Sequence, residues 1–295
     1  MIVLAGTDLD GTFFNNQSRI SDYNRQAVRD WVQSGRDFAI CSGRSLPTVS
    51  QLFSHDLRVP GYKVCLNGGI VYDKDDQPIM RRPLDNAVVL AAFHVAKHYL
   101  ARIVFFAEHH AVSYTPGIMG RVRGNWHNGE TIKITREDDL VRMLTVDHVQ
   151  FYKFTFNGIF GNGFSFALAM KKIAALPIHL SRSNRFFYEA NAPHTTKASA
   201  LHTIATTTGR SMANFMCFGD YENDLEMIRD VGYGVAMANA IPKIKAVARS
   251  RRWTTTTMAW ARCYTLCSLA KFNKTIHYPI KVFTTVQLFA TMWLC

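Results

Sequence analysis

The chain has 295 residues, of which 48% are hydrophobic and 19% charged, a composition that is typical of folded globular domains and argues against intrinsic disorder. Its net charge of +12 would ordinarily indicate a nucleic acid or a membrane surface as a partner, but nine of these charges lie after residue 230, where the sequence has no acidic residue. Because the rest of the chain is close to neutral, we expect no nucleic-acid partner and no membrane partner. The sequence does not begin with a secretory signal pattern, so we expect a cytoplasmic location.

An apolar run at residues 2–5 is followed by two carboxylates, Asp8 and Asp10, and then by Gly11. We expect a buried strand here, and if its extended geometry continues through residue 9, both acids point to the same side. Neighbouring carboxylates raise each other's pKa unless a cation or a shared proton lies between them. The pair therefore indicates a divalent metal site or a division into acid and base, and a plain Asp-Gly turn is the alternative.

Helices and strands alternate in the residues that follow. Ser21 is expected to cap a helix, a strand at 37–41 runs into Ser42, and a second helix is expected over 46–53. This alternation predicts an α/β fold with a parallel sheet and right-handed crossovers, in which ligands bind beyond the carboxyl ends of the strands. Asp8 and Ser42 both lie at such ends.

The next hundred residues have a different pattern. After a strand at 62–66 and a hairpin, a helix is expected over 84–100, and short apolar runs then alternate with two further helical stretches. We interpret residues 83–187 as an inserted α+β domain. Residues 1–82 and 188–253 then form one discontinuous α/β domain.

Further polar residues follow where the α/β domain resumes. Lys197 opens a helix, and the acidic segment with Asp220, Asn223 and Asp224 comes directly after an apolar run at 215–218. Each residue alone has an ordinary explanation as a helix cap or a surface side chain. Phosphoryl transfer, however, uses the whole set, because Mg²⁺ prefers carboxylate oxygens, a carboxylate can accept the phosphoryl group, and lysine and hydroxyl donors neutralise its oxygens.

At these positions the chain resembles the haloacid dehalogenase-like (HAD) superfamily, specifically the Cof-type phosphatases that carry a large cap domain. The resemblance covers residues 1 to about 250. Its motifs are similar to residues 7–12, Cys41 to Arg44, Lys197 and residues 219–224, and two further signatures are similar to residues 67–69 and 234–240.

The resemblance implies a Rossmann-like core with an inserted cap, and a Mg²⁺-dependent phosphatase that acts on a small phosphorylated metabolite, with a sugar phosphate expected. It implies that Asp8 is the nucleophile that becomes an aspartyl-phosphate and that Asp10 is the proton donor and then the base. The implied substrate-binding residues are Ser42, Gly43, Lys197 and Asn223. The implied metal ligands are Asp8, Asp220, the backbone carbonyl of Asp10 and, in support, Asp224.

Two other functions remain open at this stage. A phosphomutase or another phosphotransferase of the same superfamily would use the same residues, but it would pass the phosphoryl group to an acceptor. A basic nucleic-acid-binding protein would need a coherent basic face rich in aromatic side chains.

The sequence departs from the family pattern after residue 248. Where the family has an Asn- and Asp-rich loop ending in Asp-Gly-Val, this chain has four threonines, Thr254 to Thr257, followed by Met258 and Ala259. Read from the third base of each codon, a Thr-Thr pair encodes Asn, Asp, His or Tyr, and Met258-Ala259 encodes Gly. We therefore interpret residues 254–295 as an atypical basic tail produced by a frameshift, with a genuine divergent tail as the alternative. Independent sequencing of the gene would decide, because an unbroken frame would contradict the frameshift.

Overall fold

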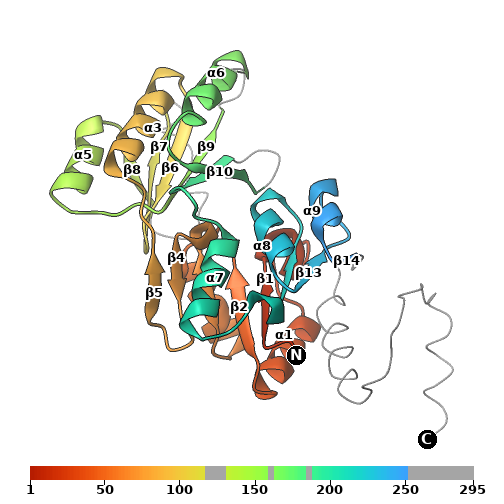
Figure 1. The fold of residues 1–295 in the computed structure, drawn as a ribbon. Coiled ribbons are helices and arrows are strands. Elements are labelled where there is room, and N and C mark those ends of the chain that lie inside the picture. The colour runs from red at the N-terminus through yellow and green to blue at the C-terminus, as the bar shows by residue number, and fades with distance from the viewer. Residues whose placement is uncertain (117–130, 159–162, 184–187, 252–295) are drawn as a thin grey trace, which may run out of the picture.

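Two β-sheets organise the chain in the computed structural model, which describes residues 1–116, 131–158, 163–183 and 188–251 (Figure 1). The expected tail at 254–295 lies outside the described residues. The first sheet contains, in spatial order, β14 (Ser250–Arg251), β13 (Tyr233–Ala236), β12 (Phe215–Gly219), β1 (Leu4–Thr7), β2 (Asp37–Cys41), β3 (Tyr62–Cys65), β4 (Ile70–Tyr72) and β5 (Pro78–Arg81).

The first sheet is parallel from β14 to β3 and antiparallel at β4 and β5. The parallel strands confirm the α/β fold that the alternating sequence pattern predicts and the Rossmann-like core that the family resemblance implies. The associated helices are α1 (Asp22–Gln33), α2 (Leu46–Gln51), α7 (Lys197–Thr207), α8 (Leu225–Asp230) and α9 (Pro242–Val247). The expected cap of α1 is confirmed, because the Ser21 side chain accepts a hydrogen bond from the backbone N–H of Asn24 at 3.2 Å.

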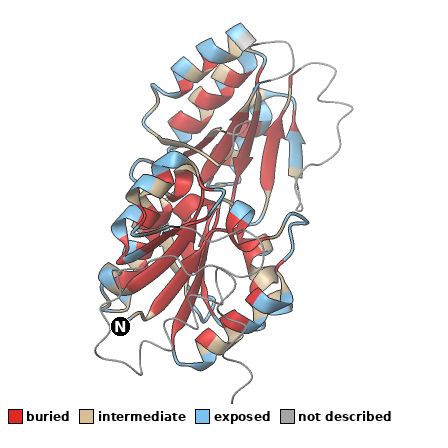
Figure 2. Ribbon diagram, turned by 90° about the vertical axis from the view of Figure 1, so that its right-hand side faces the viewer, coloured by how far each residue is buried: buried red, intermediate tan, exposed pale blue. Residues whose placement is uncertain are grey.

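Side chains cover both faces of the first sheet. On one face the ring of Phe38 in β2 contacts the rings of Phe13 and Phe53. On the other face Gly6 in β1 lies against Leu201 of α7. The central strands β1, β2 and β3 are buried between these layers, as the red colour in Figure 2 shows, whereas the edge strand β5 is partly exposed.

The second sheet is built from the inserted segment and lies at one end of the first sheet (Figure 1). Its helices are α3 (Asn86–His98), α5 (Glu137–Thr145) and α6 (Gly163–Ile173). Its strands are, in spatial order, β10 (His179–Arg182), β11 (Tyr188–Asn191), β9 (Lys153–Asn157), β6 (Arg102–Phe106), β7 (Ala111–Tyr114) and β8 (Thr131–Ile134).

The second sheet extends past the boundary that we expected at residue 187. The strand at 188–191, which the sequence analysis assigned to the first domain, pairs with β9 and β10 in the second sheet. This strand has only four residues, and Glu189 and Asn191 are polar, so it lacks the continuous apolar run of the strands in the first sheet. Four further residues therefore belong to this sheet.

The two faces of the second sheet have different environments. Ile103 and Phe105 of β6 pack into the cluster formed with the helices, whereas Val104 and Phe106 join the core of the first sheet. Successive residues of a strand point to opposite faces, which explains this division. The face directed at the first sheet also carries buried polar side chains, namely Ser113, Lys153, Thr155, Glu189 and Asn191.

Within the described part of the chain, no helix combines the length and the apolar character needed to cross a bilayer.

Candidate active site

Three neighbouring strands of the first sheet end at the same edge. Thr7 at the end of β1 pairs with Ile40 on one side and with Phe218 on the other. The backbone N–H of Asp8 continues this register by donating to the carbonyl of Phe218 at 3.0 Å. The segments that carry Asp8, Ser42 and Asp220 therefore leave the sheet side by side, as the sequence predicts.

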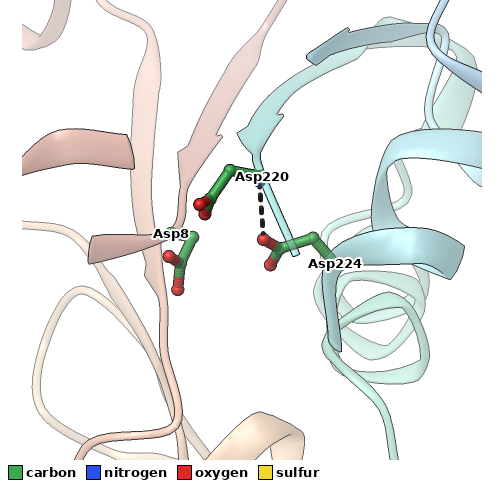
Figure 3. A group of neighbouring side chains, drawn as sticks. All are labelled: Asp8, Asp220 and Asp224. Atoms are coloured by element: carbon green, nitrogen blue, oxygen red, sulfur yellow. Dashed lines mark hydrogen bonds between the residues drawn. The ribbon is translucent and has the colours of Figure 1, made fainter. Parts of the chain in front are cut away.

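Three buried carboxylates converge at this edge (Figure 3). Asp8 follows β1, Asp220 follows β12 and Asp224 precedes α8, and one carboxylate oxygen of each lies within 4.8 Å of the others. Asp224 accepts a hydrogen bond from the backbone N–H of Asp220 at 2.9 Å. Because Asp8 lies more than 200 residues before Asp220 and Asp224, the fold brings the three acids together.

A buried lysine balances part of this negative charge. The Nζ of Lys197, the first residue of α7, donates to Asp8 Oδ1 at 2.6 Å and to Asp224 Oδ1 at 2.7 Å. Thr196 caps α7 by accepting from the backbone N–H of Ser199 at 3.1 Å, which fixes where the helix starts and so where Lys197 enters the site. One cation among three carboxylates leaves the cluster with an excess of negative charge.

The pKa values of the cluster reflect this imbalance. Burial, together with Asp224 and Asp220, raises the pKa of Asp8 well above its usual range, although Lys197 opposes the shift. Burial and the charge of Asp224 raise the pKa of Asp220 to about 7. Burial alone would lower the pKa of Lys197, but Asp224 and Asp8 outweigh it and raise that pKa. An additional cation would therefore stabilise the ionised carboxylates.

Asp220 is held in place by neutral donors. Thr12 Oγ1 donates to Asp220 Oδ1 at 3.1 Å, and Asn239 Nδ2 donates to Asp220 Oδ2 at 2.9 Å. Gly11 has a φ of +81° and lies so close that a Cβ there would come within 2.4 Å of Asp220 Oδ2. The glycine after Asp10 thus serves both the turn and the close approach of the carboxylate.

Asp10 lies in the turn that follows β1. The strand ends at Thr7, but the backbone of Asp8 (φ −71°, ψ 165°) and of Asp10 (φ −78°, ψ 118°) is still extended before Gly11 turns the chain. The Asp10 side chain is 60% exposed and accepts from Arg44 Nε at 2.9 Å and from Arg44 Nη2 at 2.7 Å. The Asp10 side chain is therefore exposed and paired with Arg44, whereas the three carboxylates of the cluster are buried.

The remaining predicted residues lie in the loops after β2 and β12. Ser42 is buried, and its Oγ accepts from the backbone N–H of Arg44 at 3.2 Å. Asn223 Nδ2 donates to Asn67 Oδ1 at 3.2 Å, and the backbone N–H of Asn67 donates to the carbonyl of Ser42 at 2.9 Å. Gly43 lies beside Asn67, because a Cβ at Gly43 would be 3.1 Å from Asn67 Oδ1. Ser42, Gly43 and Asn223 are therefore joined through Asn67.

Several side chains of this region were not assigned a role from the sequence. Arg44 and Asn67 stand in segments that resemble family signatures, so their motifs were a usable signal. Lys153 and Glu189 carried a weaker signal, the alternation of polar and apolar residues in β9 and β11. They meet the loop after β2 only through the packing of the two sheets.

The residues present fit a divalent metal ion. Asp8, Asp220 and Asp224 offer hard carboxylate oxygens within one small volume, and Lys197 alone does not neutralise them. Mg²⁺ is bound in proteins through few carboxylates together with water and substrate phosphates, which matches this donor set.

Three carboxylates and a lysine gathered at the ends of parallel strands are groups that phosphoryl transfer uses, and sequence comparison identifies the family. The chain belongs to the haloacid dehalogenase-like hydrolases, whose family model matches residues 6–257. The resemblance found in the motifs is thus confirmed, and the chain is an enzyme of this family. The match ends within the threonine run at the start of the atypical tail.

Individual relatives cover most of the chain. The 5-amino-6-(5-phospho-D-ribitylamino)uracil phosphatase YcsE of Bacillus subtilis is 26% identical over 84% of this chain and 88% of its own length. The HMP-PP phosphatase of Serratia proteamaculans is 25% identical over the same shares. The structure of a haloacid dehalogenase-like hydrolase from B. subtilis has a TM-score of 0.77 at 20% identity, covering 90% of this chain and 99% of the other, which supports the fold.

Proposed function

We propose that this protein is a Mg²⁺-dependent phosphomonoesterase that hydrolyses a small phosphorylated metabolite of the sugar phosphate class through an aspartyl-phosphate. One observation carries the proposal: buried Asp8 is paired with Lys197 inside a carboxylate cluster, one strand away from Ser42. The names of the two relatives, both phosphatases, support it.

In the first step Asp8 is the nucleophile. Lys197 holds Oδ1, which leaves Oδ2 to form a bond with the substrate phosphorus while the bond between phosphorus and the ester oxygen breaks. The Ser42 hydroxyl and Lys197 neutralise the phosphoryl oxygens, and a donor of this kind is typically worth about 3 to 4 kcal/mol in the transition state. The phosphoryl group is then carried on Asp8.

Asp10 moves the protons. In its protonated form it gives a proton to the departing ester oxygen, and as a carboxylate it then takes a proton from the water that attacks the aspartyl-phosphate. Arg44 donates a hydrogen bond to each oxygen of Asp10. Substrate binding must therefore displace one of these bonds before Asp10 can give a proton to the ester oxygen.

The acid cluster supplies the cofactor site. Asp8 and Asp220, with Asp224 in support, would hold Mg²⁺, and the backbone carbonyl of Asp10 is the further ligand that the motif implies. When bound, the ion supplies positive charge that keeps Asp8 ionised and offsets the charge of the phosphoryl group. Thr12 and Asn239 orient Asp220 for this role by hydrogen bonding to its two oxygens.

The second sheet serves as a lid in this proposal. Its face toward the first sheet carries buried polar side chains above the loops of the site. A lid of this kind excludes water from the reacting groups and contacts the part of the substrate that leaves.

The test is a screen of phosphorylated metabolites for phosphate release, carried out with Mg²⁺ and with EDTA. We expect release from several sugar phosphates with Mg²⁺, without any added acceptor, and its loss in EDTA. Turnover that appears only with an acceptor would indicate a phosphomutase or another phosphotransferase instead. Full activity in EDTA would contradict the metal requirement.

A further inference from the structure

Two buried charges of the second sheet face the first sheet. In the antiparallel pair of β9 and β11, Lys153 lies opposite Asn191 and Glu189 lies opposite Thr155, so the two charges are diagonal neighbours on one face. Lys153 Nζ is 2.9 Å from Glu189 Oε1 and 4.7 Å from the ring centroid of Phe106. Both side chains are less than a tenth exposed.

This pair reaches across to the loops of the active site. Lys153 Nζ donates to the carbonyl of Gly43 at 2.5 Å, and Glu189 Oε2 accepts from Asn67 Nδ2 at 2.7 Å. Burial alone would raise the pKa of Glu189, but Lys153 and the hydrogen bond from Asn67 outweigh it and lower that pKa. Each member of the pair thus makes one hydrogen bond to a loop of the first sheet.

The peptide between Gly43 and Arg44 connects Lys153 with Ser42. Its carbonyl accepts from Lys153, and its N–H donates to Ser42 Oγ at 3.2 Å. Because a peptide group is planar, the contact that fixes its carbonyl also fixes the direction of its N–H. Ser42 Oγ accepts this bond, so its own hydrogen is left to donate to a phosphoryl oxygen.

Glycine at position 43 permits this approach. A Cβ there would lie 3.3 Å from Lys153 Nζ and 3.3 Å from Glu189 Oε2, closer than ordinary van der Waals contact. The loop after β2 is thus shaped to receive the charged pair of the second sheet.

We propose that Lys153, held by Glu189, is a positioning residue that orients Ser42 for the phosphoryl group of the substrate. Phosphate binding by the first sheet then depends on the contact of the second sheet with Gly43. The inference rests on the proposed phosphatase function and adds to it a residue of the inserted domain that acts on the phosphate end of the substrate.

Two other roles for the pair make different predictions. If Lys153 contacted the leaving group, its loss would affect substrates unequally and would leave the binding of inorganic phosphate unchanged. If the pair only stabilised the packing of the two sheets, its loss would lower the Tm, with no effect on phosphate binding well below the Tm.

The experiment compares the wild-type protein with the double variant Lys153→Met/Glu189→Gln, which leaves no unpaired buried charge. Binding of inorganic phosphate in Mg²⁺ is measured by calorimetry and as product inhibition, and kcat/KM is measured for p-nitrophenyl phosphate and for one sugar phosphate. Lys63→Met is the matched control, because Lys63 is also buried, lies 5.1 Å from the Phe53 ring centroid and pairs with Asp76 in the β4–β5 turn.

We expect the double variant to bind inorganic phosphate about tenfold more weakly, the loss expected for one hydrogen bond from a charged group, and to lose kcat/KM by a similar factor with both substrates. Lys63→Met should keep the wild-type values. The single variant Glu189→Gln keeps Lys153 and should show a smaller loss of phosphate affinity and of kcat/KM. It replaces the double variant in the test if the double variant does not fold.

Unchanged phosphate affinity in the folded variants would overturn the inference, whether the Tm falls or the two substrates lose activity unequally. A wild-type protein that neither binds phosphate nor hydrolyses either ester would overturn the proposed function first, and the inference with it. The two failures are therefore distinguishable.

Discussion

The two sheets contribute to the site in different ways. The first sheet supplies Asp8, Lys197, Asp220 and Asp224 from the ends of its strands and the start of α7, where backbone geometry holds each group. The second sheet reaches the site with side chains alone, such as Lys153. In the proposed mechanism the reacting groups therefore lie on the first sheet, and changes in the second sheet should adjust the activity rather than abolish it.

The largest expected effect is that of Asp8→Asn. Because the amide is a poor nucleophile, we expect kcat to fall by at least about 1,000-fold, since a covalent step is lost, while the fold is kept. Phosphate release from p-nitrophenyl phosphate measures kcat, and the circular dichroism spectrum measures whether the fold is kept. Asp138→Asn, which alters an exposed acid of α5 in the second sheet, is the control and should be fully active. Substantial turnover by Asp8→Asn would contradict the nucleophile assignment.

Lys197→Met should be the most destabilising of these changes. It leaves Asp8 and Asp224 buried without their cation, and removing one partner of a buried pair costs about 3 to 5 kcal/mol. Urea unfolding in EDTA measures the loss in the free energy of unfolding. Lys63→Met should lose about 1 kcal/mol or less, because its partner Asp76 is 70% exposed and is solvated by water instead. Equal losses in the free energy of unfolding of the two variants would contradict the argument that burial of the partner carboxylates makes the loss of Lys197 costly.

Asp220→Asn should have opposite effects on activity and on the stability of the metal-free protein. The folded pKa of Asp220 is about 7 and its ordinary value is 3.8, so the folded state binds more protons than the unfolded state between these values. Stability in EDTA therefore falls as the pH rises from about 4 to about 7. The variant should lose part of this dependence of stability on pH. At neutral pH in EDTA its free energy of unfolding should exceed that of the wild type by at most about 4 kcal/mol. Its binding of Mg²⁺ should be weaker.

Unfolding curves at several pH values, with and without Mg²⁺, test this prediction. Asp138→Asn should keep the wild-type slope, since its carboxylate is exposed. A variant that is less stable than the wild type in EDTA at neutral pH would contradict the raised pKa of Asp220.

The smallest expected effect concerns the buried polar face of the second sheet. Thr155→Val keeps the shape of a side chain on that face and removes one hydroxyl. If this face contacts the leaving group, the ratio of kcat/KM between two sugar phosphates should change by about three- to tenfold, while Mg²⁺ affinity stays the same. If kcat/KM falls equally for all substrates and the ratio is unchanged, Thr155 affects stability and not the contact with the leaving group.

The first sheet could be predicted from the sequence because its signals are local. Apolar runs that end in an acid or a serine mark the strand ends, and the order of strands and helices places those ends together, so Asp8, Ser42 and Asp220 were found at one edge. The pairing of Asp10 with Arg44 was not predictable from spacing, since it joins positions 34 residues apart through the loop after β2.

The second sheet gave weaker signals. Its strands β8 and β11 have four residues each and carry several polar side chains, so neither stood out as a strand. The contact of Lys153 with Gly43 joins positions 110 residues apart and arises only when the two sheets pack. Local pattern carries no information on such a pairing, which is why Lys153 and Glu189 were missed.

The most direct test of the account is to trap the phosphoryl group on the enzyme. The protein is mixed with ³²P-labelled p-nitrophenyl phosphate and Mg²⁺, quenched in acid within one turnover, and digested so that the labelled peptide can be identified by mass spectrometry. The account predicts label on the peptide that contains Asp8, more of it in Asp10→Asn, and none in Asp8→Asn. Label on another residue, or rapid hydrolysis without a phosphorylated enzyme, would contradict it.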